Sequence, residues 1–226
     1  MFLEGEMIMK CAAELFEIIQ KKCELEPINT QGFDNLKIQG MKFDIKAYRA
    51  KGLGHISFMN AKGLFGLMQM DTIIVTPLEK DLPLFSYDRI KAFGTDTLIG
   101  ELFDTVVNLE SLDVVDELET LTAGYRDLPR RNPGKHWYDD IKLSGGMSYK
   151  GKKKISGAFD KLSKEYVMTF FNLPDIPVTD VAVKKQKTLN YVNDLLENGG
   201  PSTNVFINAI GKERTKKLFY QVLFGV

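Results

Sequence analysis

The sequence is poor in the residues that usually hold metal ions or form disulfide bonds. Its 226 residues include two histidines, His55 and His136, and two cysteines, Cys11 and Cys23. Neither histidine has a second histidine, a cysteine or a paired carboxylate at the spacing typical of metal ligands. Both cysteines fall in one predicted helix, about 18 Å apart at 1.5 Å per residue, which is too far for a disulfide between them. We therefore expect neither a metal site nor a disulfide framework.

The common nucleotide-binding and hydrolase motifs are also missing. The chain contains no GxGxxG after a strand, no GxxxxGK[ST] and no GxSxG, and the glycine pairs in LSGGMS and ENGGPS lack the context that these motifs require. An enzyme of this kind would take its electrons from outside. Its own residues would then contribute ligand binding and proton transfer.

The chain has no excess of charge and no long apolar run. Thirty basic and thirty acidic residues cancel, so a charged partner must meet a local patch, such as the lysines at 150–154 or Lys184, Lys185 and Lys187. No run of about 18 apolar residues occurs, and the start lacks a basic signal-peptide region. We expect a cytoplasmic protein that binds neither nucleic acid nor a membrane.

The residue pattern predicts one α/β domain over residues 1–226. Residues 6–24 carry apolar side chains at steps of three and four, as in an amphipathic helix. From Lys42 to Val107 the pattern changes to short β-rich runs, which read KFDIKAYRA, HISFMNA, GLFGLMQMDTIIVT, LFSYDRIKAF and TLIGELFDTVV. We expect these runs to form consecutive antiparallel strands.

The third and fifth of these runs are apolar on both alternating sets of residues. In the third run, for example, Phe65 and Ile73 fall on one side and Met68 and Ile74 on the other. A sheet with such strands must be covered on both faces. The opening helix can supply these covers together with four helices expected near 152–172, 178–198, 203–210 and 212–223. The sequence thus predicts a three-layer α/β/α sandwich with a central antiparallel sheet, and the Gly- and Pro-rich segment 118–151 is expected to wrap an edge or cover a site.

Two acids interrupt otherwise apolar strand faces. In LFSYDRIKAF, Asp88 alternates with Leu84, Ser86, Ile90 and Ala92. Burial disfavours the ionised form, so such an acid can stay protonated near neutral pH and deliver a proton to a ligand. Asp71, in MQMDTIIV, presents the same anomaly. The two acids could face one cavity, or each could be satisfied by an arginine or by backbone donors.

Two segments carry a resemblance to a known family. The stretch VTPLEKDLPLFSYD, with its DLP turn, resembles the ferredoxin-dependent bilin reductases, and so does the ending FINAIGKERTKKLFYQVLFGV. The wider superfamily includes the red chlorophyll catabolite reductases. The resemblance covers roughly the last three quarters of the chain and implies the same sandwich fold.

The resemblance also implies catalytic positions. The proton-donating aspartate of the family falls on Asp88. Asp71 stands where the phycocyanobilin-forming members place a catalytic histidine. Gly200 stands where many members carry a second catalytic aspartate, so Asp71 or Asn198 would have to supply that function.

The same resemblance implies positions that bind the substrate. Lys150 corresponds to a basic residue that binds a propionate. We also expect Asn198, two positions before Gly200, and Met68, on an apolar strand face, to contact the substrate. The ligand would lie between the sheet and the C-terminal helices.

The implied activity is reduction of a linear tetrapyrrole, a bilin, by single electrons from reduced ferredoxin and protons from the protein. No bound cofactor is expected, and a monomer is expected. The lysines at 152–154 and 184–187 would form a docking patch for the acidic ferredoxin. A non-catalytic binder or carrier of a bilin or haem breakdown product is the main alternative, and an interaction domain with a filled core is the third.

Overall fold

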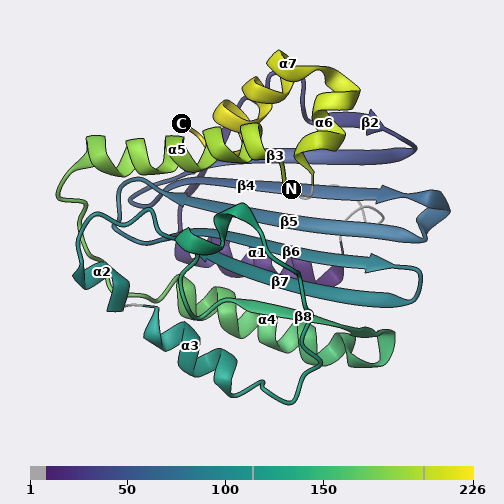
Figure 1. Cartoon of the computed structure of the whole chain (residues 1–226), viewed down its shortest axis with the longest axis horizontal. Coiled ribbons are helices and arrows are strands. Elements are labelled where there is room, and N and C mark those ends of the chain that lie inside the picture. The colour runs from purple at the N-terminus through teal and green to yellow at the C-terminus, as the bar shows by residue number, and fades with distance from the viewer. Residues whose placement is uncertain (1–8, 114, 201) are drawn as a thin grey trace.

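The centre of the molecule is one antiparallel sheet. The structure, a computed structural model, describes residues 9–113, 115–200 and 202–226, and within them eight strands lie in the order β1-β3-β4-β5-β6-β7-β8, with β2 also paired to β3 (Figure 1). The strands are β1 (Leu25–Ile28), β2 (Asn35–Ile38), β3 (Met41–Ala50), β4 (Gly54–Gly63), β5 (Met68–Pro77), β6 (Leu84–Ala92), β7 (Thr95–Phe103) and β8 (Met147–Lys152). Every pair of neighbours is antiparallel, as the sequence predicted.

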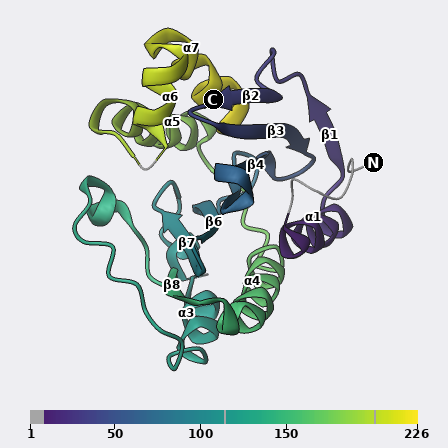
Figure 2. The same cartoon turned by 90° about the vertical axis from the view of Figure 1, so that its right-hand side faces the viewer.

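Helices cover both faces of this sheet. They are α1 (Lys10–Lys22), α2 (Glu110–Asp113), α3 (Asp116–Ala123), α4 (Ser156–Phe170), α5 (Val181–Asn198), α6 (Thr203–Ile210) and α7 (Lys212–Lys217). Short 3₁₀ turns are η1 (Leu64–Gly66), η2 (Trp137–Ile141) and η3 (Lys153–Ile155), and the π-helical turn η4 (Leu218–Leu223) follows α7. Figure 2, seen along the strands, separates α1 and α4 on one side from α5, α6 and α7 on the other.

Two apolar cores lie on the two faces of the sheet. In the first core, Phe16 of α1 and Phe159 of α4 pack with Phe85 of β6. In the second, Tyr191 of α5 and Phe206 of α6 join the inward side chains of β3 to β7. Alternate residues of each central strand therefore serve opposite cores, which is why those strands are apolar on both sides. The predicted α/β/α sandwich is confirmed.

The predicted strand over residues 63–76 begins too early in the sequence. Residues 64–67 turn the chain between β4 and β5, and Phe65 is exposed instead of lying on a sheet face. Gly66 has a φ of 83°, which favours glycine and breaks the strand. The short strands β1 and β2 were not predicted, because four residues carry little periodic signal. The strand β8 was expected only through the family resemblance, which placed Lys150 on a strand.

The basic cluster at 184–187 is not the surface patch that the sequence suggested. Lys184 is fully buried, and its Nζ lies 3.2 Å from Oδ1 of Asp81, in the DLP turn. Lys187 donates to Oδ1 of Asp104 at 2.9 Å. These two lysines fasten α5 to the sheet. Lys187 remains partly exposed, and Lys185 is the exposed lysine of the cluster.

On the first core's face, a charged network joins α4 to the sheet. Arg89 of β6 is buried and donates from Nε and Nη2 to both oxygens of Asp96, at 2.5 and 2.8 Å. Its Nη2 also lies 3.0 Å from Asp160 of α4.

Cys11 and Cys23 are free thiols, as expected from their separation. In the described part of the chain, no helix is both long and apolar enough to cross a membrane.

Candidate active site

A cavity of about 180 Å³ lies between the sheet and the C-terminal helices, where the sequence placed the ligand. Its floor is formed by β4 to β7, its roof by α5, α6 and η4, and its side by the segment 131–138. The floor residues are Met59, Met70, Thr72, Ile74, Ser86, Asp88, Ile90, Ile99 and Glu101. The roof and side residues are Tyr191, Leu195, Ser202, Thr203, Phe206, Phe219, Leu223, Phe224, Arg131, His136 and Tyr138. The walls are thus largely apolar and aromatic, with a few polar groups directed inward.

Asp88 is the acid of this cavity, as predicted from its apolar strand face. It lies on β6 opposite Thr72 of β5, whose Oγ1 donates to Asp88 Oδ1 at 2.5 Å. Burial, with a smaller contribution from the nearby Glu101, raises the pKa of Asp88 to about 6 against the opposing effects of Thr72 and Arg131. Near neutral pH a fraction of Asp88 therefore carries a proton that faces the cavity.

Asp71 does not face this cavity, so the expectation that both acids share one site is wrong. In the β5–β6 register, Thr72 is opposite Asp88 and Asp71 is opposite Arg89. Asp71 points to the other face, where its oxygens accept from Asn60 Nδ2 at 2.7 Å and from the Met9 backbone N–H at 3.0 Å. Burial raises the pKa of Asp71 to about 6.

The spacing of the two acids explains this error. Thr72 lies directly opposite Asp88, and side chains alternate between the two faces along each strand, so in both strands the even-numbered residues share the face of Asp88. Asp71 is odd-numbered, seventeen positions before Asp88. A side chain at position 71 must therefore point away from the cavity.

Three residues predicted to bind a substrate lie outside the cavity wall. Met68, the first residue of β5, is on the correct face but lies one pleat beyond Met70, which lines the cavity instead. Lys150 is exposed on β8, two strands away from Asp88. Asn198 is exposed at the end of α5.

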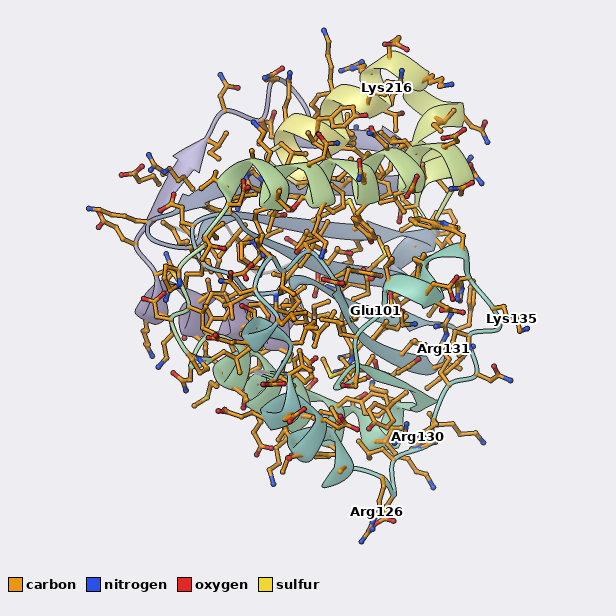
Figure 3. All side chains as sticks on the ribbon, turned by 60° about the vertical axis from the view of Figure 1, so that its left-hand side comes forward. Glu101, Arg126, Arg130, Arg131, Lys135 and Lys216 are labelled. Carbon is orange, nitrogen blue, oxygen red and sulfur yellow. The ribbon has the colours of Figure 1, made fainter. Side chains whose placement is uncertain are left out.

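The cavity has a cation that the sequence did not single out. Arg131 lines it from the segment beside β8, held there by the bond from its backbone N–H to the Ser148 carbonyl at 3.0 Å. Glu101, on β7, pairs with Lys142 at 2.9 Å, and the guanidinium of Arg131 forms no ion pair with a carboxylate among the described residues. Figure 3 places Glu101 over the sheet and Arg131 on the segment at its edge, with Arg126 and Arg130 before it and Lys135 after it along that segment.

His136 is a second group that sequence reasoning missed as a site residue. Its ring lines the cavity and stacks on Tyr138, with ring centroids 4.8 Å apart and planes at 10°. Its Nδ1 is buried without a hydrogen-bond partner and lies 3.9 Å from Asp139 Oδ1. The available signal was its place in the Gly- and Pro-rich segment that the sequence suggested could cover a site.

The described residues contain no group of three or more histidines, cysteines and carboxylates able to hold a metal ion. The polar groups of the cavity are instead two carboxyls, Asp88 and the lysine-paired Glu101, together with one imidazole, one guanidinium and several hydroxyls. Together they can donate protons to a large conjugated ligand and bind its acidic substituents.

An antiparallel sheet between two helical layers, with a cavity under the C-terminal helices, is the class of fold that the resemblance to the bilin reductases implied. Phytochromobilin synthase from tomato, solved in complex with biliverdin, has this fold with a TM-score of 0.77. The two sequences are 16% identical, and the match covers 96% of this chain and 82% of that one. No protein-family model and no curated protein matches the chain. The comparison confirms the fold.

Proposed function

We propose that this protein binds a linear tetrapyrrole in the cavity and reduces it, with Asp88 as a proton donor. The observation that carries the proposal is the carboxyl of Asp88, whose pKa near 6 fits a general acid, on the floor of an aromatic-walled cavity. The similarity to a fold solved with biliverdin supports the choice of ligand.

The reaction would add two electrons and two protons across one double bond of the pigment. Reduced ferredoxin, a one-electron donor, would supply the electrons in two steps. Asp88 would transfer its proton to the ligand as the first electron arrives. Thr72 donates to Oδ1 of Asp88, which would leave Oδ2 to carry the acidic proton.

The second proton would come from His136. It lines the same cavity, and its stacking on Tyr138 holds the ring in place. Histidine is the side chain that most often transfers protons in enzyme active sites. This assignment replaces Asp71 and Asn198, neither of which lines the cavity.

Arg131 would bind a propionate of the ligand in place of Lys150. It is a cation on the cavity wall, and guanidinium groups bind carboxylates through two parallel hydrogen bonds. The exposed cations next to it, Arg126, Arg130 and Lys135, would attract the acidic ferredoxin to the edge of the cavity (Figure 3).

The test is an anaerobic absorbance titration with biliverdin, followed by addition of chemically reduced ferredoxin. A red-shifted bound spectrum that moves to shorter wavelength on reduction would support the proposal. A bound spectrum that does not respond to ferredoxin would favour a carrier of the pigment. Absence of binding would overturn both readings.

A further inference from the structure

Four large apolar side chains project from one end of the sheet. Phe65 is 108% exposed and Phe93 69%, while Leu67 is 58% and Leu64 40% exposed. Three of them lie in the turn between β4 and β5, and Phe93 lies in the turn between β6 and β7. The two turns are adjacent, because the Phe93 backbone N–H donates to the Leu67 carbonyl at 3.2 Å. We call these four residues the apolar tip.

The backbone of the apolar tip is strained in a way that holds the side chains outward. Leu64, Phe65 and Phe93 have φ values of 51°, 55° and 49°. This left-handed region is unfavourable for large side chains and normally selects glycine or asparagine. A turn without another role would be more stable with those residues. Large apolar side chains occupy these positions although the left-handed backbone disfavours them and their exposure to water is also unfavourable, which points to a function for them.

Three lysines lie on one side of the apolar tip. Lys152, the last residue of β8, pairs with Thr95, two residues after Phe93, and is followed by Lys153 and Lys154. All three lysines are exposed. The neighbouring carboxylates in these strands, Asp71 and Asp96, are buried, and Asp96 is paired with Arg89. The three lysines form no ion pair with any residue that the structure describes, so this end of the sheet combines projecting apolar groups with positive charge.

We propose that this end of the molecule docks on the surface of an anionic phospholipid membrane, with the apolar tip in the headgroup layer. Apolar insertion and attraction of lysines to acidic lipids are the two contributions that make peripheral binding stable. Figure 2 looks at this end of the sheet, with the turn after β4 toward the viewer. The net charge of the chain is zero, so the attraction to anionic lipid would come from the local cluster of lysines at 152–154.

The shape of the surface favours a bilayer over a folded partner. Phe65 stands free of its own chain, so a protein partner would need a matching hollow, whereas a lipid interface adapts to a projecting loop. A second copy of this chain would bring the same lysines against each other, which is unfavourable. An acidic protein fits the charge but not the convex apolar turns.

The inference is independent of the proposed reaction, although the two sites are close. Met70 and Ile90 line the cavity and lie two residues inward from Met68 and Ala92, which border the turns of the apolar tip. A bound membrane would therefore lie near one end of the cavity. Failure of either proposal leaves the other standing, because membrane binding is measured without pigment or electron donor.

The experiment is co-sedimentation of the full chain with vesicles of phosphatidylcholine alone and of phosphatidylcholine mixed with phosphatidylglycerol. We expect binding to the mixed vesicles that weakens as salt is added. The double variant Phe65→Asn, Phe93→Asn should lower the partition coefficient at least about tenfold, since each ring contributes a large apolar area. Asparagine tolerates the left-handed backbone, so this variant should fold normally.

Two matched controls separate the surface from general effects. Leu109 is 83% exposed on a different part of the chain, and Leu109→Asn should bind vesicles as the wild type does. Lys153→Glu with Lys154→Glu should lower binding to mixed vesicles about tenfold, whereas exposed Lys185→Glu should not.

Equal binding to both vesicle types, or equal loss in the Leu109→Asn control, would overturn the proposal. So would vesicle binding that survives the double variant. If the apolar-tip variant instead abolished self-association, or association with an acidic iron–sulfur protein, the surface would belong to a protein partner.

Discussion

Asp88 and Asp71 are similar carboxyls with different surroundings. Each has a pKa raised by burial to about 6. Asp88 faces a cavity with aromatic walls, while Asp71 is enclosed by Asn60 and the backbone of Met9. A raised pKa therefore does not identify a catalytic acid unless the geometry gives the proton somewhere to go.

Replacing Asp88 by Asn should preserve pigment binding and lower the rate of reduction at least about 100-fold, because the amide has no acidic proton. In the wild type the rate should fall as the pH rises through about 6, since the pKa of Asp88 lies there and only its protonated form donates. Single-turnover rates across pH, with the bound spectrum recorded at each point, provide the measurement. Normal turnover in the variant would remove Asp88 from the mechanism.

Replacing His136 by Gln should stop the reaction after the first proton transfer, because one proton source would be lost while Asp88 remains. The stacking partner Tyr138 and the cavity wall are kept in this variant. A transient radical spectrum that persists in the variant but decays in the wild type would support the assignment. A variant that reduces the pigment completely at the normal rate would contradict it.

Asp71 should affect stability and not turnover. Its folded pKa of about 6 exceeds the ordinary value of 3.8, so the folded chain binds more protons between these pH values. The contribution of Asp71 to the free energy of unfolding thus falls as the pH rises through this window, by up to about 3 kcal/mol. Urea unfolding of the wild type and of Asp71→Asn at both ends of the window should show a difference that changes with pH. A constant difference would contradict the assignment.

At the scale of elements, α5 is joined to the DLP turn by a buried ion pair. Lys184 and Asp81 are both fully buried, and Asp81 also accepts from Ser111 Oγ and from the backbone N–H groups of Val107 and Asn108. Burial lowers the pKa of Lys184 to about 8. The pair thus positions the helix that carries Tyr191 and Leu195 over the cavity.

Replacing Lys184 by Met should lower the free energy of unfolding by about 3–5 kcal/mol, because the carboxylate of Asp81 loses its buried cation. Exposed Lys185→Met is the matched control and should change it by less than about 0.5 kcal/mol. Urea denaturation followed by circular dichroism measures both. Equal stability of the two variants would show that the backbone donors suffice for Asp81.

The segment that carries Arg131 and His136 should move when pigment binds. The cavity, at about 180 Å³, is smaller than the roughly 300–1,000 Å³ of pockets that enclose drug-sized ligands. Hydrogen exchange in this segment, over residues 126–136, should slow by at least about tenfold with biliverdin bound, and Arg131→Gln should weaken both binding and this protection. Unchanged exchange at saturating pigment would place the ligand elsewhere.

At the scale of the whole molecule, the alternation of residues predicted the sandwich and the acid of its cavity. Asp88 was found because the alternation within a single strand is enough to show a lone carboxyl on an apolar face. The error at Asp71 arose because the face that it shares with Asp88 depends on the register between two strands. The sequence of either strand alone does not give this register. Arg131 and His136 were missed because a segment without periodicity shows its direction only after it has packed against β8 and Tyr138.

The order of segments along the chain also determines when a ribosome-bound protein acquires its cavity. The floor comes from residues 59–101, but Phe219, Leu223 and Phe224 of the roof come more than 100 positions later. During synthesis, the apolar strand face beneath this roof must wait for those aromatic side chains to leave the ribosome. The nascent sheet therefore exposes its apolar face to solvent for about half of translation. A chaperone that binds during this period would have the greatest effect on the yield of folded protein.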